Sequence, residues 1–132
     1  MDIVTASKII DKYNNQPHIR GSIDCNLLIL ELFDKSKFDR FVGRYKTLTG
    51  AIRVARKEFG VSSIYEMLST ESTYEPIDCN FQQPLDIVSF HGCHDVFISL
   101  GDKWFGVDDN DIFSVISKDN YNNKDYTIFR RK

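Results

Sequence analysis

The chain has 132 residues, 42% of them hydrophobic and 13% aromatic, which suffices for one hydrophobic core and is too little for two ordinary domains. We therefore expect a single domain over residues 1–132. The 17 basic and 19 acidic side chains give a formal net charge of −2 and are interleaved along the sequence, which argues against nucleic-acid binding because that function needs a basic face.

The first predicted elements are two helices. Apolar residues lie on one stripe over residues 3–13, and Asp2 is suited to cap the first turn. A second helix is expected to begin near Asp24. Over residues 27–33 its apolar side chains cover nearly the whole circumference, so this helix should be buried on most sides and form the centre of the domain.

Two further helices are predicted next along the chain. Over residues 48–59, apolar residues recur at helical spacings with basic residues opposite, and Gly60 is placed to end the helix. Ser63 and Glu66 have the spacing of a capping box, which indicates the start of a short fourth helix.

After Pro76 and Pro84 the pattern changes to that of short strands. The runs span residues 87–90, 96–100, 103–107, 112–116 and 126–129. Gly101 and Asp102 favour a tight hairpin between the second and third runs. Helices first and strands second indicate an α+β fold, with the N-terminal helices packed on one face of a C-terminal antiparallel β-sheet.

The sequence contains no targeting segment that we recognise. It has no apolar run of about 18 residues, so we predict no membrane insertion. Ser7, Lys8 and Asp11 interrupt the stretch that would be continuous in a secretion signal, so we also expect no signal peptide. Any action outside the cytoplasm would then need another route of delivery.

Three cysteines are present, namely Cys25, Cys79 and Cys93. An odd number of widely spaced cysteines, in a domain large enough to fold unaided, favours reduced thiols over a disulfide framework. Cys79, Cys93, His91 and His94 could in principle hold zinc, but no paired C-x-x-C motif is present. We predict neither a metal site nor a cofactor.

Cys25 has the most distinctive setting of the three. It follows a loop that contains Gly21, and it opens the apolar helix directly after Asp24. Partial positive charge and unpaired N–H groups at a helix N-terminus lower the pKa of a thiol and stabilise an oxyanion. Cys25 is therefore a candidate nucleophile. The alternative is a small buried residue, which is the commonest fate of a free cysteine.

Residues 21–25, 84–90 and 94–102 together carry a family resemblance. In their order and spacing they resemble the NlpC-type cell-wall cysteine peptidases, which have a papain-like fold. In that family an Asp-Cys pair starts the central helix, a Gly-Asp pair starts the first strand, and a histidine starts the second strand. Residues 43–60 and the ending Phe129-Arg130 are similar to a compact branch of this superfamily found in bacteriophage and prophage genes.

The resemblance implies a catalytic site. Cys25 would attack a peptide carbonyl, His94 would act as the base, and Asp108 would orient the imidazole. Asp108 also fits a solvated acidic turn. We expect His18 and Trp104 to contact the substrate, the alternatives being a surface loop histidine and a core aromatic residue.

The position of the base is open, because the sequence departs from the family here. Counting back from Leu100, the family's histidine falls on Asp95. A strand reverses face with every residue, so His94 would point away from Cys25 unless a bulge restores the phase. His91 is the alternative base.

These residues are compatible with two main functions. The first is a phage-associated cysteine peptidase or amidase that cuts peptidoglycan peptides and is carried with the virion tail. The second is a virion structural or tail-assembly protein with the same fold and a decayed site, favoured by the phase of His94 and by the lack of a polar partner on the following strand apart from Asp108. A small module that binds a host protein is a third reading. The expected partners are peptidoglycan peptides or phage tail proteins, and the expected location is the virion or the host cytoplasm.

Overall fold

The computed structural model describes residues 2–121 and 125–132 of the chain. The helices come first, and they are α1 (Ile3–Tyr13), α2 (Cys25–Phe33), α3 (Lys35–Phe41), α4 (Leu48–Phe59) and α5 (Ile64–Thr70). The strands follow, and they are β1 (Tyr74–Ile77), β2 (Ile87–Phe90), β3 (Val96–Ser99), β4 (Trp104–Val107), β5 (Phe113–Ile116) and β6 (Tyr126–Arg131). Two short 3-10 helices lie between strands, η1 (Cys79–Phe81) and η2 (Lys118–Tyr121).

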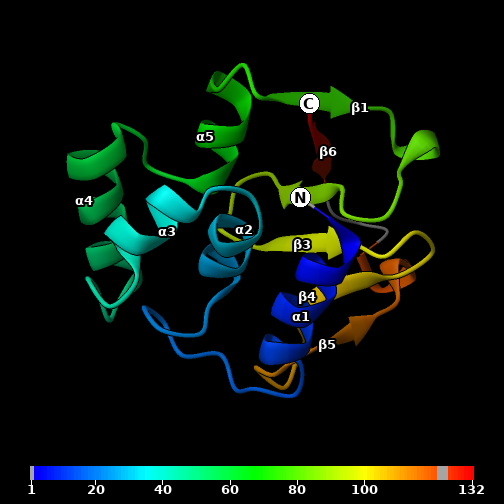
Figure 1. Cartoon of the computed structure of the whole chain (residues 1–132), viewed down its shortest axis with the longest axis horizontal. Coiled ribbons are helices and arrows are strands. Elements are labelled where there is room, and N and C mark those ends of the chain that lie inside the picture. Colours follow the sequence, from blue (N-terminus) through cyan, green and yellow to red (C-terminus); the bar gives the residue numbers. More distant parts are fainter. Residues whose placement is uncertain (1, 122–124) are drawn as a thin grey trace.

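The strands form a six-stranded sheet in the order β1-β6-β2-β3-β4-β5, and each described pair is antiparallel. Strands β2 to β5 are sequential neighbours, whereas β6 returns to lie between β1 and β2. Figure 1 shows the helical half of the chain, in blue to green, beside and in front of the strands, which run from green (β1) through yellow to red (β6). The predicted α+β architecture is confirmed.

The two faces of the sheet differ in what covers them. One face carries Ile87, Val96, Ile98, Phe105 and Phe129, which pack in a single core cluster with residues from all five helices. The opposite face carries an aromatic cluster that draws no residue from those helices. The helices therefore pack on one face of the sheet, as predicted.

Helix α2 is the centre of this core. All of its residues except Glu31 are buried, because apolar side chains surround its axis. The Glu31 carboxylate accepts a hydrogen bond of 2.8 Å from the Tyr13 hydroxyl and pairs with Lys12, so the polar residue of α2 is held by α1. This arrangement fastens the C-terminal part of α2 to α1.

Helix α3 and strand β1 were not among the predicted elements. Helix α3 follows α2 without a loop, since Asp34 ends α2 and caps α3 by accepting from the Lys37 N–H at 3.2 Å. Strand β1 contains Pro76, which lacks a backbone donor. It forms the edge of the sheet and pairs with β6 alone, a position where proline is tolerated.

Candidate functional site

The N-terminus of α2 is held by a buried carboxylate. Asp24 is 1% exposed, and it accepts hydrogen bonds from the Leu27 N–H at 2.8 Å, the Gly21 N–H at 2.8 Å and the Tyr45 hydroxyl at 2.6 Å. Gly21 has a φ of +93°, and a Cβ there would lie 1.9 Å from the Tyr45 carbonyl oxygen. The Gly-x-x-Asp spacing before Cys25 is thus explained by a close turn that only glycine fits.

The Cys25 thiol is bonded to the backbone of β3. Its Sγ donates to the His94 carbonyl oxygen at 3.6 Å and accepts from the Val96 N–H. The β3–β4 pairing includes Ile98 with Phe105 and does not extend to Val96. The sulfur therefore binds backbone groups at the start of β3 that β4 leaves unpaired.

This environment keeps the thiol protonated. Burial, together with the carboxylates of Asp24 and Asp95, raises the pKa of Cys25 from 9.0 to about 12. The Val96 N–H and the Arg20 guanidinium act in the opposite direction and have smaller effects on this pKa. The positive end of a helix alone is thus insufficient to activate this cysteine, because desolvation opposes the charged form.

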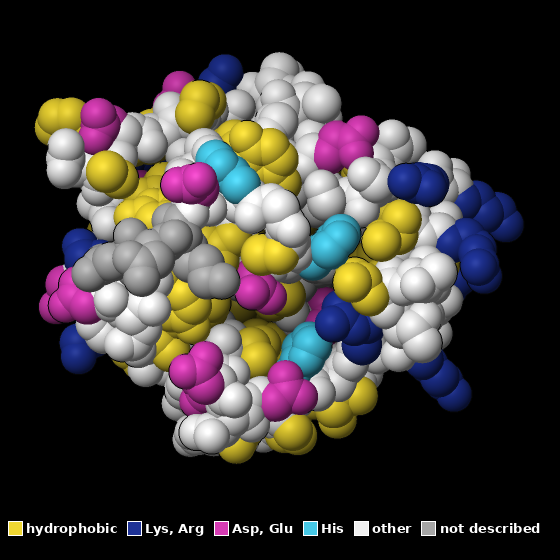
Figure 2. All heavy atoms as spheres, turned by 180° about the vertical axis from the view of Figure 1, so that it is seen from behind, with side chains coloured by type: hydrophobic (Ala, Val, Ile, Leu, Met, Phe, Trp, Pro, Cys, Tyr) yellow, Lys and Arg dark blue, Asp and Glu magenta, His cyan; other side chains and the backbone are white. Residues whose placement is uncertain are grey.

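The histidine rings contact groups other than the Cys25 sulfur. Figure 2 shows the histidine side chains on one face of the molecule, around a hollow. His91 Nε2 lies 2.6 Å from the Thr127 hydroxyl, and His18 Nδ1 lies 3.3 Å from an Asp111 carboxylate oxygen. The His94 ring lines a hollow together with Asn26 of α2. Within the described part of the chain, no imidazole forms a hydrogen bond with the Cys25 sulfur.

The phase of β3 differs from the expectation about His94. The Phe90 N–H donates to the Asp95 carbonyl at 3.1 Å, so the β2–β3 ladder continues without a bulge. Val96 faces the helices, and His94, two residues earlier, shares that phase. His94 therefore lies on the helix side of the sheet even without a bulge, which corrects the expectation. Asp95, the next residue, is exposed.

Asp108 is held by its own turn. Its carboxylate accepts from the Asn110 N–H at 2.9 Å, the Ile112 N–H at 3.1 Å and the Ser114 hydroxyl at 2.8 Å. The Ser114 hydrogen bond lowers the pKa of Asp108. The structure thus places Asp108 in the acidic turn and does not bring it to His94.

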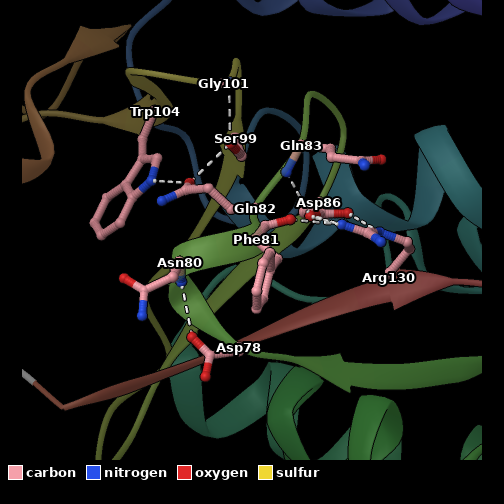
Figure 3. A network of polar contacts seen from close by, with 10 residues as sticks. All are labelled: Asp78, Asn80, Phe81, Gln82, Gln83, Asp86, Ser99, Gly101, Trp104 and Arg130. Carbon is pink, nitrogen blue, oxygen red and sulfur yellow. Dashed lines mark hydrogen bonds and ion pairs between the residues drawn. The ribbon is translucent and has the colours of Figure 1, made fainter.

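Trp104 and His18, the two residues proposed to contact substrate, form their contacts with residues other than Cys25. Trp104 is fully buried, and its Nε1 donates to the Gln82 side-chain oxygen at 3.1 Å, as Figure 3 shows. Trp104 therefore belongs to the core, and it has no surface for a substrate. The His18 ring packs against Phe113, and its Nε2 is buried without a hydrogen-bond partner.

The residues at the start of β2 have a structural role. Asp86 is buried, and its two carboxylate oxygens accept from Arg130 Nε and Nη2, each at 2.9 Å. The Gln83 N–H donates to the same carboxylate at 2.8 Å (Figure 3). Leu85 has a φ of +74°, a conformation that glycine adopts without strain, and it stands where the resemblance has a glycine. In this chain Leu85 and Asp86 thus form a turn followed by a buried carboxylate that pairs with Arg130.

The sequence gives no clear signal for three residues of this region. Tyr45 is buried, and its hydroxyl donates a hydrogen bond to Asp24. Asp95 was noted only through the register count, and its effect on the thiol pKa follows from its position in space. Asn26 carried no signal, because an amide beside the nucleophile position has no meaning until its surroundings are known.

We predicted no metal site and no membrane insertion for this chain. Among residues 2–121 and 125–132, no group of three or more His, Cys, Asp or Glu side chains is arranged to hold a metal ion. Cys79 and Cys93 are exposed free thiols. In the same residues no helix is long and apolar enough to cross a membrane.

Comparison with known proteins places the chain in a family. The model of a domain of unknown function, DUF6950, matches residues 4–118. The chain belongs to the DUF6950 family. A search of curated proteins finds no match to this DUF6950 domain.

A solved structure similar to the DUF6950 domain is the crystal structure of the NlpC/p60 domain of the peptidoglycan hydrolase SagA. The TM-score is 0.51 at 17% sequence identity, and the match covers 97% of this chain and 98% of that chain. At this identity the likeness shows the fold. The DUF6950 domain therefore has the papain-like NlpC/p60 fold that the order of its motifs predicted.

Proposed function

We propose that this DUF6950 domain keeps the architecture of a cell-wall cysteine peptidase without its chemistry, and that it serves as a structural or assembly protein of a phage tail. The observation that carries the loss of chemistry is the hydrogen bond of 3.6 Å from Cys25 Sγ to the His94 carbonyl oxygen. A thiol that donates to a carbonyl retains its proton, whereas a cysteine nucleophile acts as the thiolate.

The electrostatics support the same proposal. A papain-like cysteine is activated by an adjacent imidazole, and within the described part of the chain the Cys25 sulfur is hydrogen-bonded to the His94 backbone and to no imidazole. The Asp95 carboxylate raises the pKa of Cys25, so it opposes ionisation where an imidazolium would favour it. A thiol with a pKa of about 12 supplies very little thiolate at neutral pH.

The tail setting rests on the resemblance of residues 43–60 to a phage branch of the superfamily. Its test is the composition of purified virions made by a host that carries the gene. The protein should copurify with tails through a density gradient, and a gene deletion should reduce the number of complete tails. Absence from virions together with normal tails would argue against this setting.

A cysteine peptidase or amidase that acts on peptidoglycan peptides is the second candidate. It is favoured by the similarity to a domain of a peptidoglycan hydrolase and by the position of His94, whose backbone touches the Cys25 sulfur. In this reading the His94 ring would turn toward the sulfur when substrate displaces the thiol from the β3 backbone.

A peptidoglycan digestion separates the two candidates. Purified wild type, Cys25→Ala and Asp95→His proteins are incubated with intact peptidoglycan and with soluble muropeptides, and the products are identified by mass spectrometry. The NlpC/p60 domain of SagA serves as the active control. No products above those of Cys25→Ala are expected from the wild type. Release of new peptide ends by the wild type and not by Cys25→Ala would establish the hydrolase and overturn our proposal.

A further inference from the structure

Positive charge is concentrated in one part of the folded chain. Residues 40–58 contain six basic residues and one acidic residue, whereas the whole chain contains 17 basic and 19 acidic residues. In Figure 2 the Lys and Arg side chains gather mainly at the right edge, the side on which α4 lies, and most Asp and Glu side chains lie elsewhere on this face. The charges that are interleaved along most of the sequence are therefore segregated on the surface of the molecule.

Helix α4 carries a basic face formed by Arg53 and Lys57. The two residues are four positions apart, so they lie on the same side of α4. Both are exposed, and neither forms an ion pair with a described residue. The adjacent Glu58 is already paired with arginines that precede α4, and Arg56 lies near the Glu66 carboxylate. Like charges at this spacing repel each other, so the basic face lacks a partner within the described part of the chain.

An acidic surface is formed by Asp95, Asp108 and Asp109. Burial, followed by the carboxylates of Asp109, Asp95 and Asp108, raises the pKa of Tyr121, so the three charges lie around one side chain. Asp95 and Asp109 are exposed and form no ion pair with a described residue. Asp108 is held by hydrogen bonds within its own turn, which preorganises this part of the surface. Ile112, in the same turn, is 38% exposed and adds apolar area.

We propose that the basic face of one copy of this domain binds the acidic surface of a second copy, so that copies associate head to tail. The two surfaces are electrostatic complements, and complementary potentials select and orient a partner. A second copy is favoured over a nucleic acid, because the chain has a net charge of −2 and the two cations of the basic face neutralise too few phosphates. Because the two surfaces are different, each contact leaves one of them free, and such contacts continue into rings or open chains.

Sedimentation velocity of the full chain measures this association directly. We expect the weight-average mass at about 300 µM protein to exceed twice that of the 15.3 kDa monomer in about 20 mM salt, where screening is weak. In about 500 mM salt the mass should return to that of the monomer, because exposed charges are then screened. The measurement needs neither virions nor peptidoglycan, so its outcome is independent of the tests of the proposed function.

Charge-reversal variants test the two surfaces separately. Arg53→Glu/Lys57→Glu and Asp95→Lys/Asp109→Lys should each associate at least about tenfold more weakly than the wild type. An equimolar mixture of these two variants should associate again, because each reversed surface then meets its complement. All four residues are exposed, so the native fold should be retained, and circular dichroism of each variant checks it.

The matched control is Lys8→Glu/Lys103→Glu. It reverses two exposed cations outside the basic face and changes the net charge by the same amount as Arg53→Glu/Lys57→Glu. Its association should weaken by less than about twofold, because only the general repulsion between copies increases. The control therefore separates loss of the basic face from a change in net charge.

Four results would overturn the proposal. The first is a wild-type protein that stays monomeric in low salt, and the second is a mass that stops rising at that of a dimer. The third is a control that loses as much association as Arg53→Glu/Lys57→Glu, and the fourth is a mixture of the two reversed variants that stays monomeric. Binding of a DNA duplex that Arg53→Glu/Lys57→Glu abolishes, in a wild-type protein that does not associate with itself, would assign the basic face to nucleic acid instead.

Discussion

The Tyr45 hydroxyl donates a hydrogen bond of 2.6 Å to the Asp24 carboxylate, so the segment before α4 is fastened to the N-terminus of α2. Both side chains are buried, and the backbone carbonyl of Tyr45 also packs against Gly21. The start of α2 therefore depends on Tyr45, which follows both α2 and α3 in the sequence.

Gly21→Ala should strongly destabilise the domain. A Cβ at this position would lie 1.9 Å from the Tyr45 carbonyl oxygen, and the φ of +93° is unfavourable for alanine. We expect a loss of about 3 kcal/mol in the free energy of unfolding, measured by urea denaturation. Gly43→Ala is the matched control, because Gly43 has a φ of +76° with nothing within 4 Å of a Cβ. It should cost about 1 kcal/mol, and equal losses in the two variants would contradict the close packing.

Only the two exposed cysteines should react with Ellman's reagent in the folded protein. Cys79 and Cys93 are exposed, whereas Cys25 is buried. In a Cys79→Ser/Cys93→Ser variant, the alkylation rate of Cys25 should rise with pH, and the inflection of this profile should lie near the Cys25 pKa of about 12. Asp95→Asn should increase this rate at pH 9 to 10 (roughly the ordinary thiol range), because it removes a carboxylate that raises the pKa. Asp39→Asn, an exposed change on α3, should have no effect. An inflection near the ordinary thiol value would show that Cys25 is not held as the structure indicates.

The domain should lose stability in alkaline solution. Burial raises the pKa of Cys25 from 9.0 to about 12 and that of Tyr74 from 10.0 to about 12. A raised pKa means that the folded state holds the proton more tightly, so its contribution is complete below the unfolded pKa and is lost as the pH rises through the folded value. The free energy of unfolding should thus fall between about pH 9 and pH 12.

The Cys25 part of this dependence can be isolated. Cys25→Ala should flatten the slope of stability against pH just above 9, where the unfolded thiol of the wild type begins to ionise. Cys79→Ala changes an exposed thiol and should leave the slope as it is. Comparing slopes rather than absolute stabilities removes the packing cost of the substitution. Parallel slopes in Cys25→Ala and the wild type would argue against a protonated buried thiol.

Arg130→Leu should be among the most destabilising changes in the sheet. It leaves the Asp86 carboxylate, whose side chain is 3% exposed, with the Gln83 N–H as its remaining donor. Removing one partner of a buried ion pair costs about 3–5 kcal/mol. Lys35→Ala breaks the pair with Asp39, in which both side chains are well exposed, and should cost less than about 0.5 kcal/mol. Thermal denaturation of both variants measures the difference, and similar losses would contradict the role of burial.

The fold was predictable where local patterns agree with tertiary structure. The helical spacing over residues 48–59 and the glycine after it correspond to α4, which ends at Gly60 with a φ of +71°. The strands after Pro84 were located to within a few residues because their apolar runs are bounded by turn residues. Helix α3 and β1 were missed because the first is short and continuous with α2, and the second contains a proline that reads as a break.

The candidate site was less predictable, because its chemistry depends on contacts between distant segments. The sequence placed Cys25 at a helix N-terminus, and the structure agrees. The thiol's partners, however, are backbone groups of His94 and Val96, which carry no sequence signal. A helix N-terminus lowers the pKa of an accessible thiol. Cys25 is buried, and desolvation raises its pKa by more than the helix N-terminus lowers it. Whether His94 or Asp108 acts in catalysis stays a prediction.

The bonding of the Cys25 sulfur to the β3 backbone has a kinetic consequence. An electrophile can reach the sulfur only after His94 and Val96 have released it, so its observed rate is the product of an opening equilibrium and the intrinsic rate of a free thiol. Chemical labelling of a single-cysteine variant would therefore report how often the contact between Cys25 of α2 and the start of β3 opens, much as amide hydrogen exchange reports the opening of a backbone hydrogen bond. The residue that marks the site in the sequence would then serve as a probe of native-state fluctuation.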